Sequence, residues 1–397
     1  MQTSIHAWHY GTRQPVQLDC DLGQITALTP ATTAPAENVW LAPALVDLQV
    51  NGYGGVDFQQ DNLRAEDLLS AVRQLHAAGV GRFLLTLVTD EWPRLTARFR
   101  HLKKLRDTSP ELRFAIAGWH IEGPFLSSEP GFCGAHDPAL MLDPTPEKIR
   151  ELAGIAARDP LLLTLAPERT GALEAIALAA SLGGVISLGH TDASSEILKH
   201  AVEAGASAFT HLGNGCPRTL DRHDNILWRV LETPGLTVSL IPDGLHLSPA
   251  PFRLLHQLLD STKIFYTTDA MSAGGAGPGS YSLGRLKVEV GADQVVRQPG
   301  RTNFAGSALR PIDGVLRAAQ MLGCPWQKVW RRYSETPAKL MGLRSELRVG
   351  GPADFCLLTF GAGGAFQRCE AYPAGVRGEG VMAAPPGRAG PGASGVE

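Results

Sequence analysis

Four side chains suited to hydrolytic chemistry each close a different apolar run of the sequence. Glu122 follows "FAIAGWHI", His190 follows "GVISLG", His211 lies within "SAFTHL" and Asp269 ends "KIFYTTD". A glutamate and two histidines form a usable ligand set for a divalent ion of the zinc type and leave positions for water and substrate. A carboxylate beside such an ion can take a proton from the attacking water and later return it to a leaving group. A single residue of this kind is more often a hydrogen-bonded core or turn residue. It is the position of all four at the ends of apolar runs that indicates a metal-dependent site.

A second group of residues could hold an anion. The loop "HLGNGCPRTLDRHDN" places Asn214 beside Gly215, and glycine lets backbone N–H groups approach an anion closely. Arg222 could add bidentate contacts to a phosphate. For Arg218 we favour a solvated loop position, and for His120, two residues before Glu122, a place in the core.

The elements that must position these residues alternate between two kinds. From residue 45 to about 345, short apolar runs alternate with amphipathic helical stretches such as "AEDLLSAVRQLHAAG", which is typical of βαβ units and a parallel sheet buried on both faces. Eight such runs match the number of strands that closes a (β/α)8 barrel, whose active sites lie at the strand C-termini. We therefore predict an α/β fold of this kind, with polar run ends converging on one mouth. These ends are Asn51, Thr89, Glu122, Glu168, His190, His211, His246 and Asp269.

The flanks of the chain have a different pattern. Residues 1–43 and 346–382 consist of short β-like pieces and turns, which predicts a small β-sandwich domain formed from both chain ends beside a barrel of residues 44–345. The glycine-rich stretch at about 274–303 predicts an inserted β-hairpin, and the low-complexity stretch 383–397 predicts a disordered tail.

Composition excludes several classes of protein. Apolar residues make up 44% and charged residues 19%, and the net charge of −3 comes without a basic block, so neither nucleic acid nor an anionic membrane is an expected partner. The sequence has no apolar run of about 18 residues and no signal-peptide pattern at its start. Its six cysteines are scattered without a C-x-x-C pair, which favours reduced thiols. We expect a soluble cytoplasmic protein.

The order of the motifs resembles the N-acetylglucosamine-6-phosphate deacetylase family of the amidohydrolase superfamily. The resembling pieces span residues 41 to about 359 and include "LAPALVDLQVNGYGGVDF", "HIEGPFLSSEPGFCGAH", "LGHTDAS", "THLGNG", "PDGLH", "TTDAMSAGG" and "FAGSAL". The "HIEGPF" and "GAH" pair and the "PDGLH" box are specific to this family, whereas "GH" and "TDA" are common across the superfamily. The sequence departs from the family at Gly213, where a bulky residue is common.

The resemblance implies a role for each matching residue. Glu122, His190 and His211 would be the metal ligands, Asp269 the catalytic aspartate, and His136 the histidine that contacts the sugar and helps polarise the acetyl carbonyl. The resemblance also implies residues that hold the sugar phosphate, among them an arginine that reaches across a dimer interface. It further implies a loop that closes on the substrate. The residues that would hold the phosphate are Asn214, Gly215, Arg222 and His246, and those of the closing loop are Phe304, Ala305 and Gly306.

Gln49 and Asn51 stand where superfamily members with two metals carry a pair of histidines on the first strand. Neutral amides are poor ligands for a zinc-type ion compared with imidazole. The resemblance therefore implies one divalent metal ion per subunit, with zinc the expected metal.

The implied reaction is hydrolysis of N-acetyl-D-glucosamine 6-phosphate to D-glucosamine 6-phosphate and acetate by a homodimer. One alternative is an amidohydrolase acting on another N-acyl amino-sugar phosphate or on a cyclic amide. Cyclic-amide hydrolases commonly need a carboxylated lysine, and no lysine lies at the eight run ends. Another alternative is a non-catalytic sugar-phosphate sensor, against which the intact Glu-His-His-Asp set argues.

Overall fold

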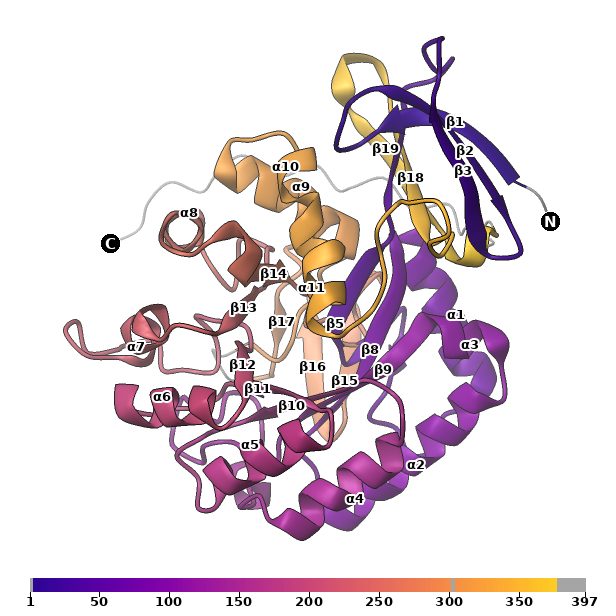
Figure 1. Ribbon diagram of the computed structural model, residues 1–397. Coiled ribbons are helices and arrows are strands. Elements are labelled where there is room, and N and C mark those ends of the chain that lie inside the picture. Colours follow the sequence, from indigo (N-terminus) through magenta and orange to yellow (C-terminus); the bar gives the residue numbers. More distant parts are fainter. Residues whose placement is uncertain (1–2, 301–303, 377–397) are drawn as a thin grey trace.

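The computed structural model of the protein describes residues 3–300 and 304–376. The predicted disordered tail, 383–397, lies outside the described residues, as do the ends of the predicted hairpin insert and of the C-terminal β segment. A barrel and a smaller sheet-rich domain account for the described chain (Figure 1).

Eight parallel strands build the barrel, in the order of the chain. In the described chain, one bridge joins Val50 at the end of the first strand to Ala270 in the segment after the last strand, and the N–H of Asn51 donates to the carbonyl of Ala270 at 2.7 Å. The predicted (β/α)8 barrel is thus confirmed. Its strands are β5 (Leu45–Val50), β8 (Val80–Val88), β9 (Ile116–Glu122), β10 (Leu161–Leu165), β11 (Val185–Leu188), β12 (Ala206–Phe209), β13 (Thr237–Leu240) and β14 (Ile264–Tyr266).

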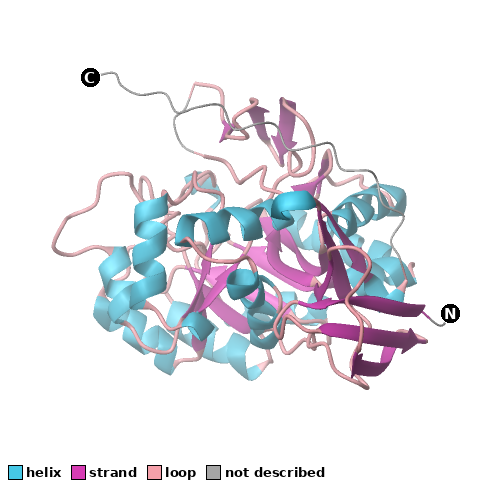
Figure 2. Cartoon of the chain, turned by 90° about the horizontal axis from the view of Figure 1, so that it is seen from above, coloured by secondary structure: helices cyan, strands magenta, loops and turns pink. Residues whose placement is uncertain are grey.

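Helices surround the barrel, as the view from above shows (Figure 2). Four of the described helices, α3, α4, α6 and α7, begin at a residue whose side chain accepts a hydrogen bond from a free backbone N–H group; for example, the Ser194 side chain accepts from the N–H of Ile197. The helices are α1 (Ala65–Ala77), α2 (Trp92–Asp107), α3 (Pro110–Ala115), α4 (Pro146–Ala156), α5 (Ala172–Ser181), α6 (Ser195–Glu203), α7 (Ile226–Glu232), α8 (Pro249–Leu258), α9 (Pro311–Leu322), α10 (Gln327–Trp330) and α11 (Glu335–Leu340). None of the described helices is long and apolar enough to cross a bilayer.

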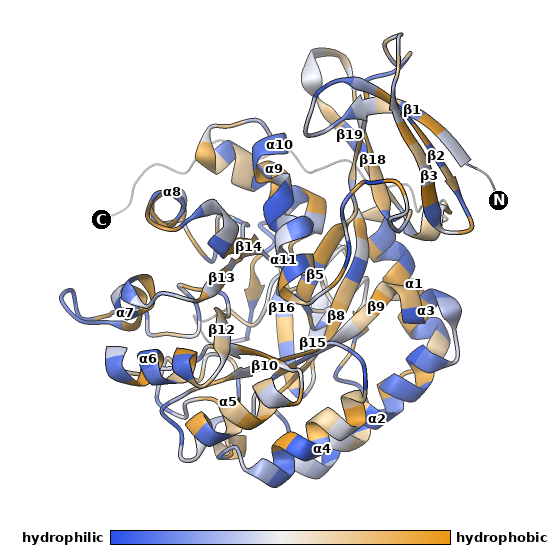
Figure 3. Ribbon diagram, in the orientation of Figure 1, coloured by the Kyte–Doolittle hydropathy of each residue, from blue (hydrophilic) through white to orange (hydrophobic). Residues whose placement is uncertain are grey.

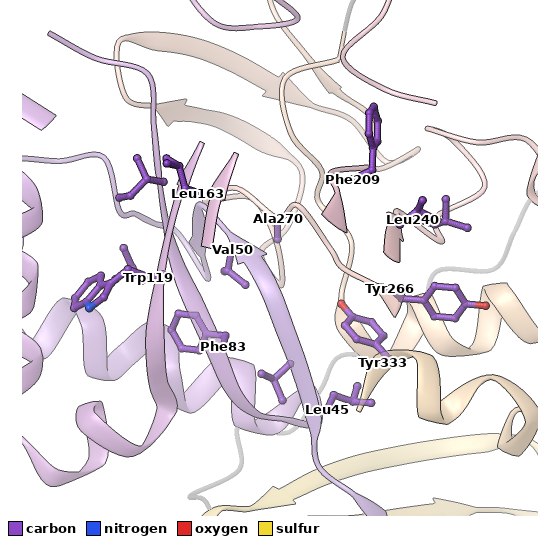
Figure 4. Packing of buried hydrophobic residues seen from close by; sticks show 14 of the residues in the cluster. Leu45, Val50, Phe83, Trp119, Leu163, Phe209, Leu240, Tyr266, Ala270 and Tyr333 are labelled. Atoms are coloured by element: carbon purple, nitrogen blue, oxygen red, sulfur yellow. The ribbon is translucent and has the colours of Figure 1, made fainter. Parts of the chain in front are cut away.

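The main core lies between the strands and these helices. Every residue of β9 is buried, and Trp119 on its outer face packs against Phe99 of α2 with ring centroids 5.0 Å apart. Figure 3 shows apolar strands beneath helices whose surfaces alternate between apolar and polar, and Figure 4 shows the packed side chains. Each large apolar side chain buried in this way contributes roughly 1.5–3 kcal/mol.

Both ends of the chain form the small domain, as predicted. Its six strands belong to one hydrogen-bonded sheet in which β4 is parallel to β1 and antiparallel to β18. The N-terminal and C-terminal strands lie side by side in Figure 1, in indigo and yellow. They are β1 (Thr3–His9), β2 (Pro15–Asp21), β3 (Gln24–Pro30), β4 (Val39–Pro43), β18 (Phe355–Phe360) and β19 (Phe366–Tyr372).

Two small antiparallel sheets flank the barrel mouth. One joins β6 (Gly52–Tyr53) and β7 (Val56–Asp57) directly after the first barrel strand. The other lies in the segment predicted as a hairpin and joins β15 (Gly279–Leu283), β16 (Leu286–Val290) and β17 (Val296–Arg297). The turn between β15 and β16 is fixed to the rim because the N–H of Gly284 donates to Asp57 at 2.9 Å and Arg285 pairs with Asp90 at 3.0 Å.

Candidate active site

The C-terminal ends of the barrel strands surround a cavity of about 1030 Å³. Loops from several strands contribute to its wall, as expected for this architecture. The cavity brings together most of the side chains that the sequence singled out. Its lining includes Asn51, Glu122, His136, His190, His211, Asn214, Gly215, His246, Asp269, Phe304 and Gly306.

A carboxylate and three imidazoles meet at the floor of this cavity. The Nε2 atoms of His211 and His190 lie 2.9 and 3.4 Å from Oε1 of Glu122, and Nε2 of His136 lies 3.9 Å from its Oε2. Possible ligand atoms of Glu122, His136 and His190 all fall within 4.8 Å of one another. His211 lies outside that group but contacts the same carboxylate, and its Nδ1 is buried without a hydrogen-bond partner among the described residues. These buried oxygen and nitrogen donors fit a divalent ion of the zinc type.

Three of the predicted residues have an unusual backbone conformation. His190, His211 and Asp269 adopt φ values of 52°, 34° and 51°, in the left-handed region that few residues other than glycine occupy. Each residue follows the end of a barrel strand, so the chain turns sharply there. Such strain persists where the surroundings fix it, and it is concentrated at functional sites.

Two glycines form a slot for the imidazole of His190. A Cβ atom at Gly134 would lie 2.8 Å from its Cε1, and one at Gly215 would lie 2.9 Å from its Nδ1. Both glycines have a positive φ, of 59° and 60°. Within the slot, Nδ1 of His190 contacts the carbonyl of Phe132 at 2.8 Å, which directs Nε2 toward Glu122.

The two carboxylates of the site have opposite electrostatic environments. Burial alone would raise the pKa of Glu122, but the imidazoles of His190 and His211 outweigh it and hold that pKa well below its usual range. Burial, together with the negative charge of Glu122, raises the pKa of Asp269 to about 7. Carboxylates whose pKa values are driven apart in this way suit different roles, one remaining an anion and one exchanging a proton.

His136 enters the cavity from the loop after β9. Its Nδ1 contacts Oγ1 of Thr89 at 2.8 Å, and its ring lies edge-on to that of His190 with centroids 4.8 Å apart. Burial and the neighbouring His190 lower the pKa of His136 to about 3. A neutral imidazole at this position can donate one hydrogen bond toward a substrate without adding charge.

The residues predicted to hold an anion are only partly brought together. His246 lines the cavity, contacts Asp243 through Nδ1 at 2.6 Å and packs 4.9 Å from the ring of Phe304. Burial lowers the pKa of His246, but Asp243 outweighs it and raises the pKa above the usual value. Arg222 is exposed, donates through Nε to His223 at 2.9 Å and does not line the cavity of its own chain. Arg218, for which we favour a solvated loop, does line it.

Two details of the sequence interpretation concern histidines. The sequence places His246 at a strand end, but β13 ends at Leu240 and His246 lies in the following loop. Pro242 has no N–H for a ladder bond, and Asp243 instead accepts hydrogen bonds from the N–H groups of Leu245 and His246. His120 is a core residue, as interpreted, because its ring lies between the hydroxyls of Thr86 and Thr164, at 3.4 and 2.8 Å.

Comparison with known proteins gives the same identification as the motifs. The chain is 33% identical over 334 residues to N-acetylglucosamine-6-phosphate deacetylase of Bos taurus, covering 80% of this chain and 79% of the relative. It is 30% identical over 317 residues to the enzyme of Vibrio furnissii, covering 80% and 77%. The chain belongs to the N-acetylglucosamine-6-phosphate deacetylase family.

Solved structures agree with this placement. N-acetyl-D-glucosamine-6-phosphate deacetylase of Mycobacterium smegmatis, solved as a point mutant in complex with N-acetyl-D-glucosamine-6-phosphate, superposes with a TM-score of 0.81 at 30% identity over 91% of this chain and 94% of that one. Dihydropyrimidinase of Brevibacillus agri, at 11% identity and a TM-score of 0.59, shares the fold alone. No family model matches the sequence. The family resemblance and the prediction of a deacetylase-type hydrolase are therefore confirmed.

Proposed function

We propose that the protein hydrolyses the acetamide of N-acetyl-D-glucosamine 6-phosphate and releases D-glucosamine 6-phosphate and acetate. One observation carries the proposal: a carboxylate able to exchange protons, Asp269, shares a cavity with the cluster of Glu122, His190 and His211 in a chain of this family. The protein would work in the cytoplasm on this small substrate, without nucleic acid or membrane as partner.

Glu122, His190 and His211 would hold one divalent ion per chain, which we propose to be zinc. When bound, such an ion supplies Lewis acidity and lowers the pKa of a water ligand from about 15.7 to about 7. The residues of the chain account for the other steps. Asp269 takes the proton of the attacking water on the oxygen that Asn51 does not occupy, and later gives it to the departing amine nitrogen. His136 donates a hydrogen bond to the acetyl oxygen, where a single donor is typically worth about 2.7–4 kcal/mol.

We propose that Asn214, Gly215 and His246 hold the phosphate group and that the segment from Phe304 to Gly306 closes on the substrate. Asn214, Gly215 and His246 line the cavity, and the ring of Phe304 packs against that of His246. Because Arg222 does not line the cavity of its own chain, its proposed phosphate contact requires the partner copy of a homodimer. Bidentate guanidinium contacts suit a phosphate dianion.

The experiment is a measurement of acetate release from a panel of N-acetylhexosamine 6-phosphates, with unphosphorylated N-acetylglucosamine as the matched control. We expect the glucosamine derivative to be the preferred substrate, the unphosphorylated sugar to react far more slowly, and a chelator to abolish turnover. Preference for another hexosamine phosphate would favour the alternative amidohydrolase. Tight binding of all sugars without acetate release would favour a sensor.

A further inference from the structure

Three buried polar side chains lie at alternate positions in the last part of strand β5 and directly after it: Asp47, Gln49 and Asn51. The register of β5 against β8 shifts between Asp47 and Val50, so the regular alternation of side chains is interrupted there, and the contacts of each side chain show what it faces. All three are almost completely buried, with exposed fractions of 0%, 2% and 2%. Burying such polar groups costs free energy unless they are hydrogen-bonded, so their hydrogen-bond partners indicate their role.

Asp47 and Asn51 connect the first strand to the segment directly after the last strand, β14, where the barrel has its weakest backbone pairing. Among the residues that the structure describes, this seam has a single bridge, between Val50 and Ala270. Figure 4 labels both residues. Asp47 accepts hydrogen bonds from the hydroxyls of Thr267 and Thr268, at 2.5 and 2.7 Å. The segment that leads into Asp269 is therefore held in place from β5.

The side chains of Gln49 and Asn51 each donate a hydrogen bond to one carboxylate of the site. Nε2 of Gln49 lies 3.0 Å from Oε1 of Glu122, and Nδ2 of Asn51 lies 2.7 Å from Oδ1 of Asp269. Hydrogen bonds to an ionised carboxylate are among the stronger ones and fix its orientation. An amide supplies this contact without a charge.

We propose that the two amides are positioning residues with separate tasks: Asn51 orients Asp269 for proton transfer, and Gln49 orients Glu122 for metal binding. The inference rests on the proposed function, because it assigns Asp269 to proton transfer and Glu122 to the metal. In this inference each amide orients a carboxylate and is more than a replacement for a histidine ligand of a second metal ion.

The separation of tasks provides the test, which uses the full chain and the variants Asn51→Ala and Gln49→Ala. Zinc affinity is measured by competition with a chelating dye, and acetate release is measured at saturating zinc. Gln60→Ala is the matched control, since Gln60 is an amide of the neighbouring loop that contacts Asp57 outside the cavity. Thermal unfolding of each variant shows whether it folds.

We expect Asn51→Ala to lower kcat about 10–100-fold, with KM and the zinc dissociation constant within about threefold of wild type. Gln49→Ala should weaken zinc binding about 10–100-fold, as is typical when a residue that orients a metal ligand is removed. If both variants changed zinc affinity and kcat to the same extent, the inference would be overturned. A merely structural role of the amides would give such equal effects, whereas separate positioning tasks would not.

Crystal structures of zinc-loaded wild type and Asn51→Ala provide a readout independent of turnover. We expect the Asp269 carboxylate to accept from Asn51 in wild type and to occupy a different or mixed rotamer in the variant. An unchanged single rotamer would overturn the inference. A wild-type enzyme that releases no acetate would contradict the proposed function, and the zinc affinities and the Asp269 rotamer would still decide the inference.

Discussion

At the scale of single residues, the site depends on two carboxylates that differ through their neighbours. Glu122 lies among imidazoles, whereas Asp269 receives one amide hydrogen bond and faces the charge of Glu122. Glu122 thus stays ionised and able to bind a cation. Asp269 is the group whose proton can move near neutral pH.

Replacing Asp269 by asparagine keeps the size of the side chain and removes its basicity. We expect turnover to fall about 10²–10⁴-fold, the usual contribution of a positioned acid–base group. Zinc content and affinity for glucosamine 6-phosphate should change little, because Glu122 and the imidazoles remain. Acetate release and calorimetric titration of the product measure the two effects. Asp107→Asn, on the exposed side of α2, is the control, and near-normal turnover of the Asp269 variant would contradict the assignment of the base.

Sequence reasoning placed the ligand-type residues because strand ends fix where a side chain begins. Glu122 is the last residue of β9, and His190 and His211 follow β11 and β12. The ends of these parallel strands share one edge, so the meeting of the three side chains could be predicted. The same reasoning missed that Arg218 lines the cavity. This residue lies in an irregular loop, where side-chain direction depends on turns that have no periodic pattern.

At the scale of elements, the loops after the strands constrain the site as closely as the strands do. The slot around His190 consists of Gly134 and Gly215, contributed by the loops after β9 and β12. Both glycines could be read in the sequence, but their contact with one imidazole could not. It depends on the path of two loops that are distant in the chain.

Gly215→Ala tests this slot. The new Cβ would lie 2.9 Å from Nδ1 of His190, and the left-handed backbone at Gly215 would add about 1–2 kcal/mol of strain. We expect zinc affinity to fall at least about tenfold in a competition assay, because His190 must rotate or shift. The control is Gly277→Ala, where an added Cβ meets no atom within 4 Å. Equal zinc affinity of both variants would show that the slot does not orient His190.

The strands were easier to predict than the insert and the small domain. Barrel strands are buried on both faces and therefore appear as continuous apolar runs. The pairing of β4 with β18 joins segments from opposite ends of the chain, and no local pattern specifies such a partner. The β-like character of both ends could be read in the sequence, whereas the strand order of their sheet could not.

At the scale of the whole molecule, the small domain is fixed to the end of the barrel opposite the cavity. Pro43, the last residue of β4, accepts a hydrogen bond from Trp330 at 2.9 Å, and Ala44 leads directly into β5. Arg82 of β8 pairs with the buried Asp354 at 2.8 Å, which joins the barrel to the segment before β18. The strand that carries Gln49 and leads into Asn51 is thus held at its start by the small domain and along its length by its neighbour β8.

Removal of the metal should lower the stability of the whole chain, because the proposed ligands come from three strands far apart in sequence. A ligand that binds only the native state stabilises it by about 4 kcal/mol when its concentration is about 1,000 times its dissociation constant. We therefore expect a chelator to lower the unfolding temperature by several degrees while the far-ultraviolet circular dichroism at about 25 °C stays unchanged. In Glu122→Gln, which removes the charged ligand, the chelator should have little further effect. An equal chelator-induced shift in wild type and in this variant would place the stabilising ion elsewhere, since the shift would then not depend on the cluster at the cavity floor.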